Sequence, residues 1–416
     1  MKVLWFANTS CNADEYLNME LKDTGGWLKA LDVVMQDHVE LNIAFYSETS
    51  LQPFIYKGTN YFPIYSKRGF IKKVYDRMTA HVVFEEHKDL YLEVINQVKP
   101  DIIHIHGSET PFGCIINSIS IPVVISIQGN ITVYYHKYFS GIEEKYLKTT
   151  NFSLSNPFGF FQCYRTDYRR FFKMMLRERK ILLECKHIIG RTDWDYRISR
   201  VFAPNSRYYY NNEILRDYFY SNKNKWKFKD RDKKVIFTTS GAVYYKGLET
   251  ICQALFELQL IGFSIEWRIA GINVNDLIVK IVKNKLGKKF PDKGLVFLGK
   301  LNGTELVSKI LDSDIYVMPS HIENSPNNLC EAMLLGIPSI ATCAGGTSSI
   351  LKDGEEGIII QDGDPWVLSG AILQLINSKE DIYKYNNNAY KRAFGRHDKH
   401  EVYKGLIKIY EDILKE

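Results

Sequence analysis

Apolar residues along the chain fall into short runs that alternate with longer stretches of helical periodicity. Four runs in the first half have the length of buried strands in a parallel sheet: KVLWFA (2–7), VELNIAFY (39–46), DIIHIHG (101–107) and IPVVISIQGN (121–130). The stretch LKALDVVM, which follows Gly25-Gly26-Trp27, has the 3.6-residue period of a helix. This alternation predicts an open, doubly wound α/β domain.

The same alternation begins again in the second half. Its predicted strands are VIFTTSG (235–241), IEWRIAG (265–271), LVFLG (295–299), DIYVMPS (314–320) and PSIAT (338–342). Between the halves, SNKNKWKFKDRDKK (221–234) is almost wholly polar, as linkers between domains are. We therefore expect a first domain over 1–220, a linker over 221–234 and a second domain over 235–395. The helical tail, about 396–416, is a candidate to pack back on the first domain.

Residues 131–180 are rich in both aromatic and basic side chains, in the runs YYHKYFSG and NPFGFFQCYRTDYRRFFKMMLRERK. One interpretation, slightly favoured, is a long amphipathic helix that packs on its domain. The other is a cationic-aromatic surface that rests on anionic lipid headgroups or holds a lipid-linked phosphate. No RNA-binding signature accompanies these residues, so we expect no nucleic-acid partner.

Composition narrows the class of protein. The 416 residues are 45% hydrophobic and 25% charged, with a net charge of +6 that favours anionic partners mildly. No run of about 18 apolar residues occurs, and the start, MKVLWFANTS, is too short for a signal-peptide core. The seven widely spaced cysteines fit reduced thiols. We expect a cytoplasmic protein, with peripheral contact on the inner face of the membrane as an addition.

The strongest candidate for chemistry is HIENSPNNLCEAMLLGIPSIATCAGG (321–346), in which Glu323 and Glu331 lie eight positions apart. Ser325 suits a helix N-cap and Pro326 the first helical position, and the following Gly-Ile-Pro ends the helix. Helix N-termini bind anions, and carboxylates accept hydrogen bonds from hydroxyls. A loop carboxylate, a helix start and a helical carboxylate together match a nucleotide sugar, whose diphosphate lies between hydroxylated rings.

Polar residues also follow the predicted strands of the first domain. His104 and His106 end one strand, and Gln128 ends the next, at the edge where open α/β sheets bind ligands. A histidine at such a position is more often a hydrogen-bonded core residue, so both interpretations stay open. Gly25-Gly26, before the first helix, allows a phosphate to approach the backbone or simply makes a turn.

Over residues 235–363 the chain resembles the retaining glycosyltransferases of family 4, which have two Rossmann-like domains facing across a cleft, the GT-B architecture. The resemblance lies in a strand ending in SG, a KG before a helix, FLGKL, PSHIENSPNNLCEAMLLGIPSIAT, AGG and DGEEGIII. The first half is similar more loosely, through Gly25-Gly26 and DIIHIHG. GRTDWD and NNEILRDYFY resemble bacterial members that build surface polysaccharides.

The resemblance implies a role for each matching residue. Glu331 would hold the ribose, Glu323 would contact the donor sugar, and Lys246 would bind the diphosphate as a point charge. The implied catalytic residues are Glu323, Lys246 and His106. The implied donor-binding residues are Gly25, Gly26, Gly241, Lys246, Leu298, Lys300, Ser325, Asn327, Asn328, Leu329 and Glu331.

Three positions depart from the family pattern. The arginine that usually stands five residues before the lysine is Gly241 here, a frequent histidine is Gln128, and a glutamate is missing near Ser349. The missing arginine removes a bidentate phosphate partner. Candidates to replace it are Arg191, Lys300 and Arg268.

The resemblance implies transfer of a hexosyl or N-acetylhexosaminyl group from a nucleotide-diphosphate sugar, with UDP expected on frequency alone. The acceptor would be a glycan or an undecaprenyl-diphosphate-linked sugar of capsule or O-antigen (lipopolysaccharide) assembly. The resemblance implies that the acceptor hydroxyl attacks on the same face of the sugar, assisted by the departing phosphate. Independence of a metal or other cofactor is expected because nothing resembles the D-x-D metal motif of the other large transferase class. The alternatives are an epimerase of the same architecture and a non-catalytic subunit that binds nucleotide sugars.

Overall fold

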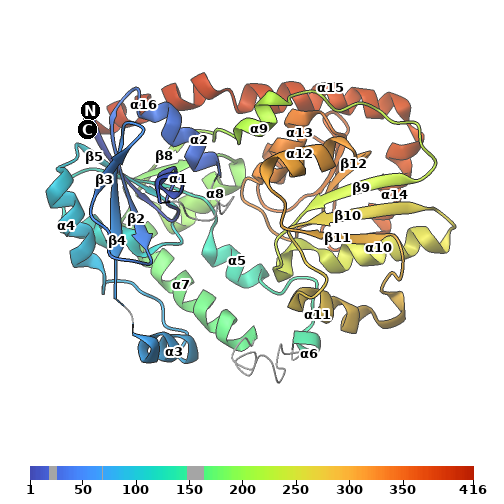
Figure 1. The fold of residues 1–416 in the computed structure, drawn as a ribbon, viewed down its shortest axis with the longest axis horizontal. Coiled ribbons are helices and arrows are strands. Elements are labelled where there is room, and N and C mark those ends of the chain that lie inside the picture. The colour runs from blue at the N-terminus through green and yellow to red at the C-terminus, as the bar shows by residue number, and fades with distance from the viewer. Residues whose placement is uncertain (18–25, 68, 148–163) are drawn as a thin grey trace. The chain divides into compact units, whose positions relative to one another are not determined.

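The computed structural model describes residues 1–17, 26–67, 69–147 and 164–416, and its helices and strands are drawn in Figure 1. They group into two compact units. The first unit consists of Met1–Tyr135, Arg165–Ile214 and His397–Glu416, and the second of His136–Tyr164 and Leu215–Arg396. The tail from residue 397 therefore groups with the first unit.

The segment 221–234, expected as a linker, packs on the second unit. Trp226 is 3% exposed, and its indole Nε1 donates to the carbonyl of Ser313 at 2.7 Å. Its backbone N–H donates to Leu335 at 3.0 Å, and the N–H of Asn224 donates to Leu334 at 2.9 Å. The buried tryptophan explains why a segment of mostly polar composition lies against a domain.

The first unit is built on an eight-stranded sheet with the order β3-β4-β2-β1-β5-β6-β7-β8. All neighbouring strands are parallel except β3 and β4, which form an antiparallel hairpin. Apolar strands buried on both faces are typical of such sheets. The strands are β1 (Lys2–Ala7), β2 (Glu40–Ser47), β3 (Phe54–Tyr56), β4 (Thr59–Tyr65), β5 (Ile102–His106), β6 (Val123–Ser126), β7 (His187–Gly190) and β8 (Arg207–Tyr210).

The β3–β4 hairpin is absent from the strands that the sequence predicts. Pro63 lies inside β4, and a proline in a run argues against a central strand. The turn residues Lys57 and Gly58 both have positive φ, 49° and 88°, which suits a tight hairpin turn. The sequence therefore contains residues suited to the hairpin turn, but Pro63 argues against a strand after it.

The helices of the first unit cover its sheet and include the last helix of the chain. They are α1 (Ala13–Tyr16), α2 (Gly26–Met35), α3 (Phe70–Met78), α4 (Lys88–Val98), the 3-10 helix η1 (Pro111–Ser118), α5 (Ile131–Lys137, which ends beyond the limit of the unit), α7 (Tyr164–Glu184), α8 (Asp193–Phe202) and α16 (Lys399–Leu414). Both the long helix predicted within 131–180 and the helical tail are present, as α7 and α16.

A buried hydrogen-bond network connects α16 to the sheet. The hydroxyl of Tyr410 accepts from Nε1 of Trp5 at 3.0 Å and lies 2.6 Å from Nδ1 of His104. The other ring nitrogen of His104 lies 2.6 Å from Oγ of Ser126. His104 is therefore a satisfied core residue that joins β1, β5, β6 and α16.

The second unit has a six-stranded, all-parallel sheet with the order β11-β10-β9-β12-β13-β14. The strand order reverses between β9 and β12, and in open α/β sheets ligands bind at such a switch point. The strands are β9 (Lys234–Thr239), β10 (Ile265–Ala270), β11 (Leu295–Gly299), β12 (Ile315–Met318), β13 (Ser339–Thr342) and β14 (Ile358–Ile360).

Helices lie on both sides of the second sheet, with α10 and α11 on one side and α13 on the other (Figure 1). Two parallel α/β units confirm the predicted fold class. The helices are α6 (Glu144–Leu147), α9 (Asp217–Ser221), η3 (Tyr244–Lys246), α10 (Leu248–Leu260), α11 (Leu277–Leu286), η4 (Gly287–Lys289), α12 (Gly303–Leu311), α13 (Asn327–Leu335), η5 (Thr347–Ser349), α14 (Pro365–Asn377) and α15 (Lys379–Arg396).

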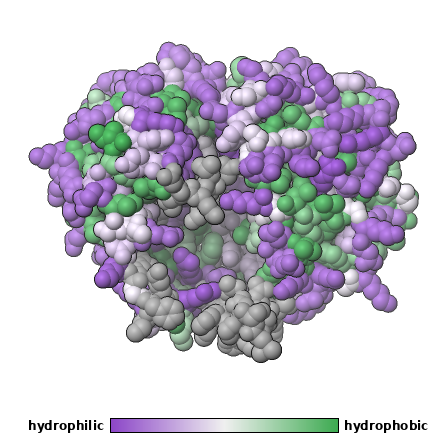
Figure 2. All heavy atoms as spheres, in the orientation of Figure 1, coloured by the Kyte–Doolittle hydropathy of each residue, from purple (hydrophilic) through white to green (hydrophobic). Residues whose placement is uncertain are grey.

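Hydrophilic residues dominate the face drawn in Figure 2, and hydrophobic residues occur there in smaller separate areas. None of the described helices is long and apolar enough to cross a membrane.

Candidate functional site

Two glycines fix the loop that leaves β12 and carries Glu323. Gly247 has φ +74°, and a Cβ there would overlap the carbonyl oxygen of Pro319. Gly345 has φ +56°, and a Cβ there would overlap the carbonyl oxygen of Glu323, which also accepts the N–H of Gly346 at 3.1 Å. Only glycine fits such positions without strain. The glycines of the KG and AGG motifs therefore pack closely against the backbone of this loop, at Pro319 and at Glu323.

Glu323 forms an ion pair with Lys246. The carboxylate is 5% exposed, and its Oε1 lies 2.5 Å from Nζ of Lys246, which ends η3 after β9. Burial, with the charge of Glu323 adding to it, raises the pKa of the neighbouring Tyr245 well above its ordinary value. Two of the residues that sequence analysis assigned to the sugar and the diphosphate are thus in direct contact.

Helix α13 begins one residue later than predicted. Its N-cap is Pro326, with no side-chain cap, and Asn327 is the first helical residue, so the prediction of Ser325 as the N-cap is wrong. Proline cannot cap with a side-chain oxygen, and the hydroxyl of Ser325 has no hydrogen-bond partner among the described residues. The start of α13 is therefore uncapped and suited to an anion.

Side-chain amides fix the start of α13 against the sheet. Asn328 donates from Nδ2 to the carbonyl of Thr239 at the end of β9, at 3.2 Å, and accepts the N–H of Leu329 at 3.0 Å. Gly336, with φ +85°, ends the helix as the sequence predicts. The N-terminus of α13 thus lies beside the carboxyl end of β9, at the switch point of the sheet.

Glu331 is held by a residue that sequence reasoning missed. Arg216 donates from Nε to Oε1 and from Nη2 to Oε2 of Glu331, both at 2.7 Å, and Glu331 is 4% exposed. This fork-to-fork geometry is the strongest arrangement between a guanidinium and a carboxylate. Arg216 lies in NNEILRDYFY, a segment that the resemblance to polysaccharide-building members includes. The spacing of residues along the sequence does not show that residue 216 contacts residue 331.

The structure also tests the candidates for the missing arginine. Arg191, in the first unit, pairs with Glu213, and Arg268 donates to Glu266 and Asp312 at 2.7 Å each. Because these two guanidiniums are engaged elsewhere, they are poor replacements for the missing side chain.

The neighbourhood of Gly241 is open. A Cβ at Gly241 would meet no heavy atom within 4 Å. Lys300 is exposed just after β11, and Leu298 lies within this strand at the edge of the sheet. Among the guanidiniums considered, Arg216 is the one in contact with a predicted site residue.

His321 begins the glutamate stretch and lies between two acids. Its Nε2 is 2.6 Å from Oε1 of Glu249, and its Nδ1 is 3.2 Å from Oδ2 of Asp362. Burial disfavours a charged imidazole, but the hydrogen bonds and charges of Glu249 and Asp362 outweigh it and raise the pKa of His321. This charged cluster joins the start of the loop to α10, through Glu249, and to the segment after β14, through Asp362.

The remaining predicted residues belong to the first unit. Gly25 lies outside the described residues, and Gly26 is the first residue of α2. His106 is 1% exposed, its ring edge contacts Trp5 and Trp27, and neither ring nitrogen has a hydrogen-bond partner among the described residues. Burial lowers its pKa far below the ordinary value, so the ring is neutral. It lines a cavity of about 20 Å³ together with Gln128.

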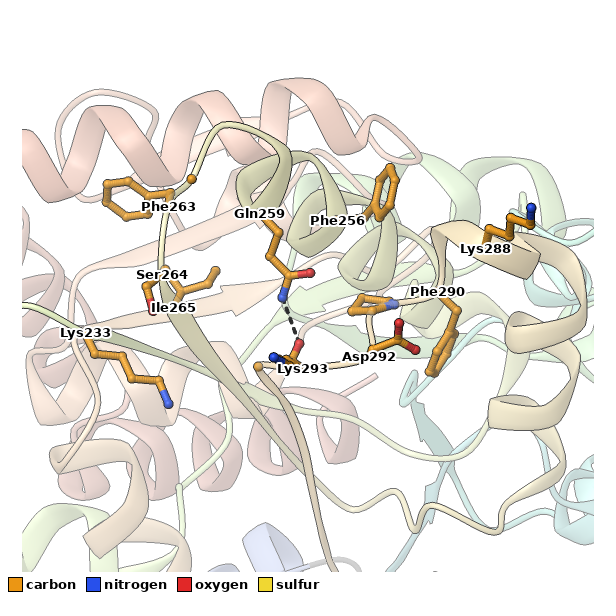
Figure 3. Close-up of a pocket in the computed structure, with 13 residues that line it drawn as sticks. Lys233, Phe256, Gln259, Phe263, Ser264, Ile265, Lys288, Phe290, Asp292 and Lys293 are labelled. Atoms are coloured by element: carbon orange, nitrogen blue, oxygen red, sulfur yellow. Dashed lines mark hydrogen bonds between the residues drawn. The ribbon is translucent and has the colours of Figure 1, made fainter.

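A larger cavity, of about 610 Å³, lies elsewhere in the second unit (Figure 3). Its lining comes from the amino-terminal ends of β10 and β11 and from the segments before them, and includes Phe256, Phe290 and Lys288. None of the predicted site residues lines it. Across the described part of the chain, no group of three or more His, Cys, Asp or Glu side chains could hold a metal ion.

Residues 221–392 match the protein family described as Glycosyl transferases group 1. Among curated proteins, the chain is similar to the capsular polysaccharide biosynthesis glycosyltransferase CapM of Staphylococcus aureus. The two are 25% identical over 153 aligned residues, and the alignment covers 35% of this chain and 40% of CapM. The match spans 40% of the length of CapM, and matches to two further curated relatives span 17% and 45% of theirs.

Solved structures show the fold over nearly the whole chain. Sucrose-phosphate synthase from Thermosynechococcus elongatus aligns with a TM-score of 0.70 at 10% identity, covering 99% of both chains. Anabaena HepE, in a complex with UDP and glucose, aligns with a TM-score of 0.63 at 14% identity over 99% of both chains. The chain has the GT-B fold, and its match to the Glycosyl transferases group 1 family is confined to residues 221–392.

Proposed function

We propose that the protein is a retaining glycosyltransferase that moves a sugar from a nucleotide-diphosphate sugar to a glycan or lipid-linked acceptor. The observation that carries the proposal is the pairing of both glutamates with cations beside the uncapped start of α13. Lys246 contacts Glu323, and Arg216 contacts Glu331. Near the switch point of the sheet, the cations and helix amides offer partners for phosphates, and the carboxylates offer partners for sugar hydroxyls.

The choice of donor is supported by the neighbours. Anabaena HepE was solved with UDP and with UDP-glucose, so a UDP-sugar is the donor that we propose to test first. CapM is named for capsular polysaccharide biosynthesis, which supports a role in assembling a bacterial surface polysaccharide. A hexosyl or N-acetylhexosaminyl group is the proposed cargo.

In the proposed reaction the bond between the anomeric carbon and the diphosphate breaks, and negative charge builds on the leaving oxygen. The ammonium of Lys246 and the first-turn amides of α13 would stabilise this charge. Glu331 would accept hydrogen bonds from the ribose hydroxyls, oriented by Arg216, and Glu323 would accept one from the sugar. The acceptor hydroxyl would attack on the face from which the diphosphate departs, as expected for a retaining transfer, without a metal ion. Its oxygen would bond to the anomeric carbon, and its proton would pass to the departing diphosphate oxygen.

The test is an incubation of the purified chain with a panel of nucleotide sugars and a lipid-linked acceptor, followed by NMR of the product linkage. Nucleotide release that requires the acceptor, with retained anomeric configuration, supports the proposal. An isomerised donor without acceptor identifies an epimerase. Saturable binding of nucleotide sugar without turnover on any acceptor identifies a binding subunit. Either of the last two results would overturn the proposal.

A further inference from the structure

The first unit contains a polar cavity that none of the predicted site residues lines. It measures about 400 Å³, within the range of small-molecule sites. Three parallel strands deliver residues to it from their carboxyl ends: Ser47 ends β2, Ser66 follows β4, and Glu109 and Thr110 follow β5. This is the edge at which α/β sheets bind ligands.

Helix α7 supplies the basic wall of this cavity. Arg170, Met174 and Arg177 line it. Met174 and Arg177 follow Arg170 by four and seven residues, so the three side chains lie on one face of the helix. His81 and His87 line it as well, and Glu109 is the one carboxylate among the lining residues. The cavity therefore has a surplus of groups that carry or can acquire positive charge.

Two buried polar atoms in the cavity lining have no hydrogen-bond partner among the described residues. Arg177 is 7% exposed, and its terminal nitrogens donate to the carbonyls of Val83 and Glu109, but its Nε has no acceptor. Glu109 accepts from Asn8 through Oε1 at 3.1 Å, whereas its Oε2 is unpartnered. Unpartnered buried groups cost stability, so they indicate a site whose partner is a ligand.

We propose that this cavity binds an oxyanion carried by the sugar acceptor, with Arg170 and Arg177 on the anion and Glu109 with the hydroxyls of Ser47, Ser66 and Thr110 on the sugar. Guanidinium groups match carboxylate and phosphate geometry, so the anion is either a sugar carboxylate or a phosphate ester. The assignment of the anion to an acceptor rests on the proposed function. The basic, aromatic stretch of the sequence thus serves an acceptor site through its α7 part.

The protonation of Glu109 supports the same assignment. Burial raises the pKa of Glu109 to about 7, with the neighbouring Glu178 adding to the rise and Arg177 and Arg191 opposing it. A carboxyl group that is protonated part of the time can donate a hydrogen bond to an anion or to a sugar oxygen. A fixed carboxylate in the same place would repel the anion.

The experiment measures binding of glucuronic acid, glucose 1-phosphate and uncharged glucose to the purified full chain by NMR saturation transfer. UDP is present in excess to occupy the donor site. We expect at least one charged sugar to bind five-fold or more tightly than glucose. The charged sugar that binds identifies the anion as a carboxylate or as a phosphate, and both binding would support the shared chemistry.

The variants are Arg170→Ala and, as a matched control, Arg169→Ala, which removes the same charge from the same exposed helix next to the cavity. Arg170→Ala should reduce binding of the charged sugar to the level of glucose, and Arg169→Ala should leave it unchanged. Glu109→Gln, which keeps the shape of the side chain, should change the affinity for charged sugars but not for UDP.

Equal affinity of all three sugars, or equal losses in Arg170→Ala and Arg169→Ala, would overturn the inference. If UDP does not bind but the effect of Arg170 persists, the proposed function fails while the anion site stands. If sugar transfer is observed without any effect of Arg170 on charged-sugar binding, the function stands and this inference fails.

Discussion

The candidate site of the second unit and the carboxyl edge of the first sheet differ in how their buried titratable side chains are paired. In the second unit, each buried carboxylate of the candidate site contacts a cation, with Lys246 on Glu323 and Arg216 on Glu331. In the first unit, His106 and Oε2 of Glu109 are buried at the carboxyl edge of the sheet without a hydrogen-bond partner among the described residues. The first arrangement is pre-organised before a ligand arrives, whereas the second leaves hydrogen-bonding atoms that a ligand would have to satisfy. We expect substitutions to separate the two kinds of site.

The largest effect is expected for Glu331→Ala. It would remove the acceptor for the ribose hydroxyls, and two hydrogen bonds to a charged group contribute about 1.5–3 kcal/mol each, so nucleotide affinity should fall on the order of 1,000-fold. Calorimetry with UDP measures this loss. Glu355→Ala, which breaks an exposed pair with Lys352, serves as a control and should bind UDP normally. Normal binding by Glu331→Ala would show that the site is wrongly assigned.

His106→Phe tests the unpartnered side of the comparison. Removal of two buried, unpartnered nitrogens should stabilise the protein by about 1 kcal/mol, because their desolvation is no longer needed. If His106 exchanges a proton with the acceptor hydroxyl, turnover should nevertheless fall about 100-fold, with UDP affinity unchanged. Thermal unfolding and acceptor-dependent UDP release give the two readouts.

His104→Phe is the matched control for that substitution. It breaks the bonds to Tyr410 and Ser126 and should destabilise the protein. A stabilised His106→Phe variant with full turnover would make His106 a core residue like His104.

A smaller effect is expected for Arg216→Lys. Lysine keeps the charge but not the two-pronged geometry, so Glu331 should lose part of its orientation and UDP affinity should fall about 10-fold. Combined with Glu331→Ala, the substitution should add little, because both residues act through one contact. Fully additive losses in the double variant would indicate that Arg216 acts on the nucleotide independently of Glu331.

The smallest effect is a gain, in Gly241→Arg. The position is open and its backbone does not require glycine, so the arginine that relatives carry should fit there. A charge-assisted hydrogen bond to the diphosphate, reduced by the entropy of ordering a long side chain, should lower the KM for donor about five-fold. Gly241→Ala is the control and should be neutral. A KM unchanged by Gly241→Arg would mean that Lys246 and the first-turn amides of α13 already saturate the diphosphate.

Features that depend on residues close together in the sequence could be predicted from it, and contacts between residues far apart in the sequence could not. The central strands, the α13 helix and its glycine stop depend on neighbouring residues, and the sequence predicted them apart from one residue at the helix start. It missed the β3–β4 hairpin. The contact between Arg216 and Glu331 joins residues 115 positions apart, and no local sequence pattern predicts such a pair. The cavity beneath α7 depends on which face of that helix turns towards the strand ends, and this is decided by tertiary packing.

The last helix, α16, has a consequence for how the chain is made. Its Tyr410 closes the hydrogen-bond network of Trp5 and His104, and residues 397–416 belong to the first unit. During synthesis the second unit, which ends at Arg396, is complete on the ribosome before the first unit has its final helix. The first unit therefore cannot be completed before the second has been synthesised, unlike the usual order for successive domains. A premature stop shortly before residue 399 would spare every residue of the candidate donor site and still leave the first unit without α16.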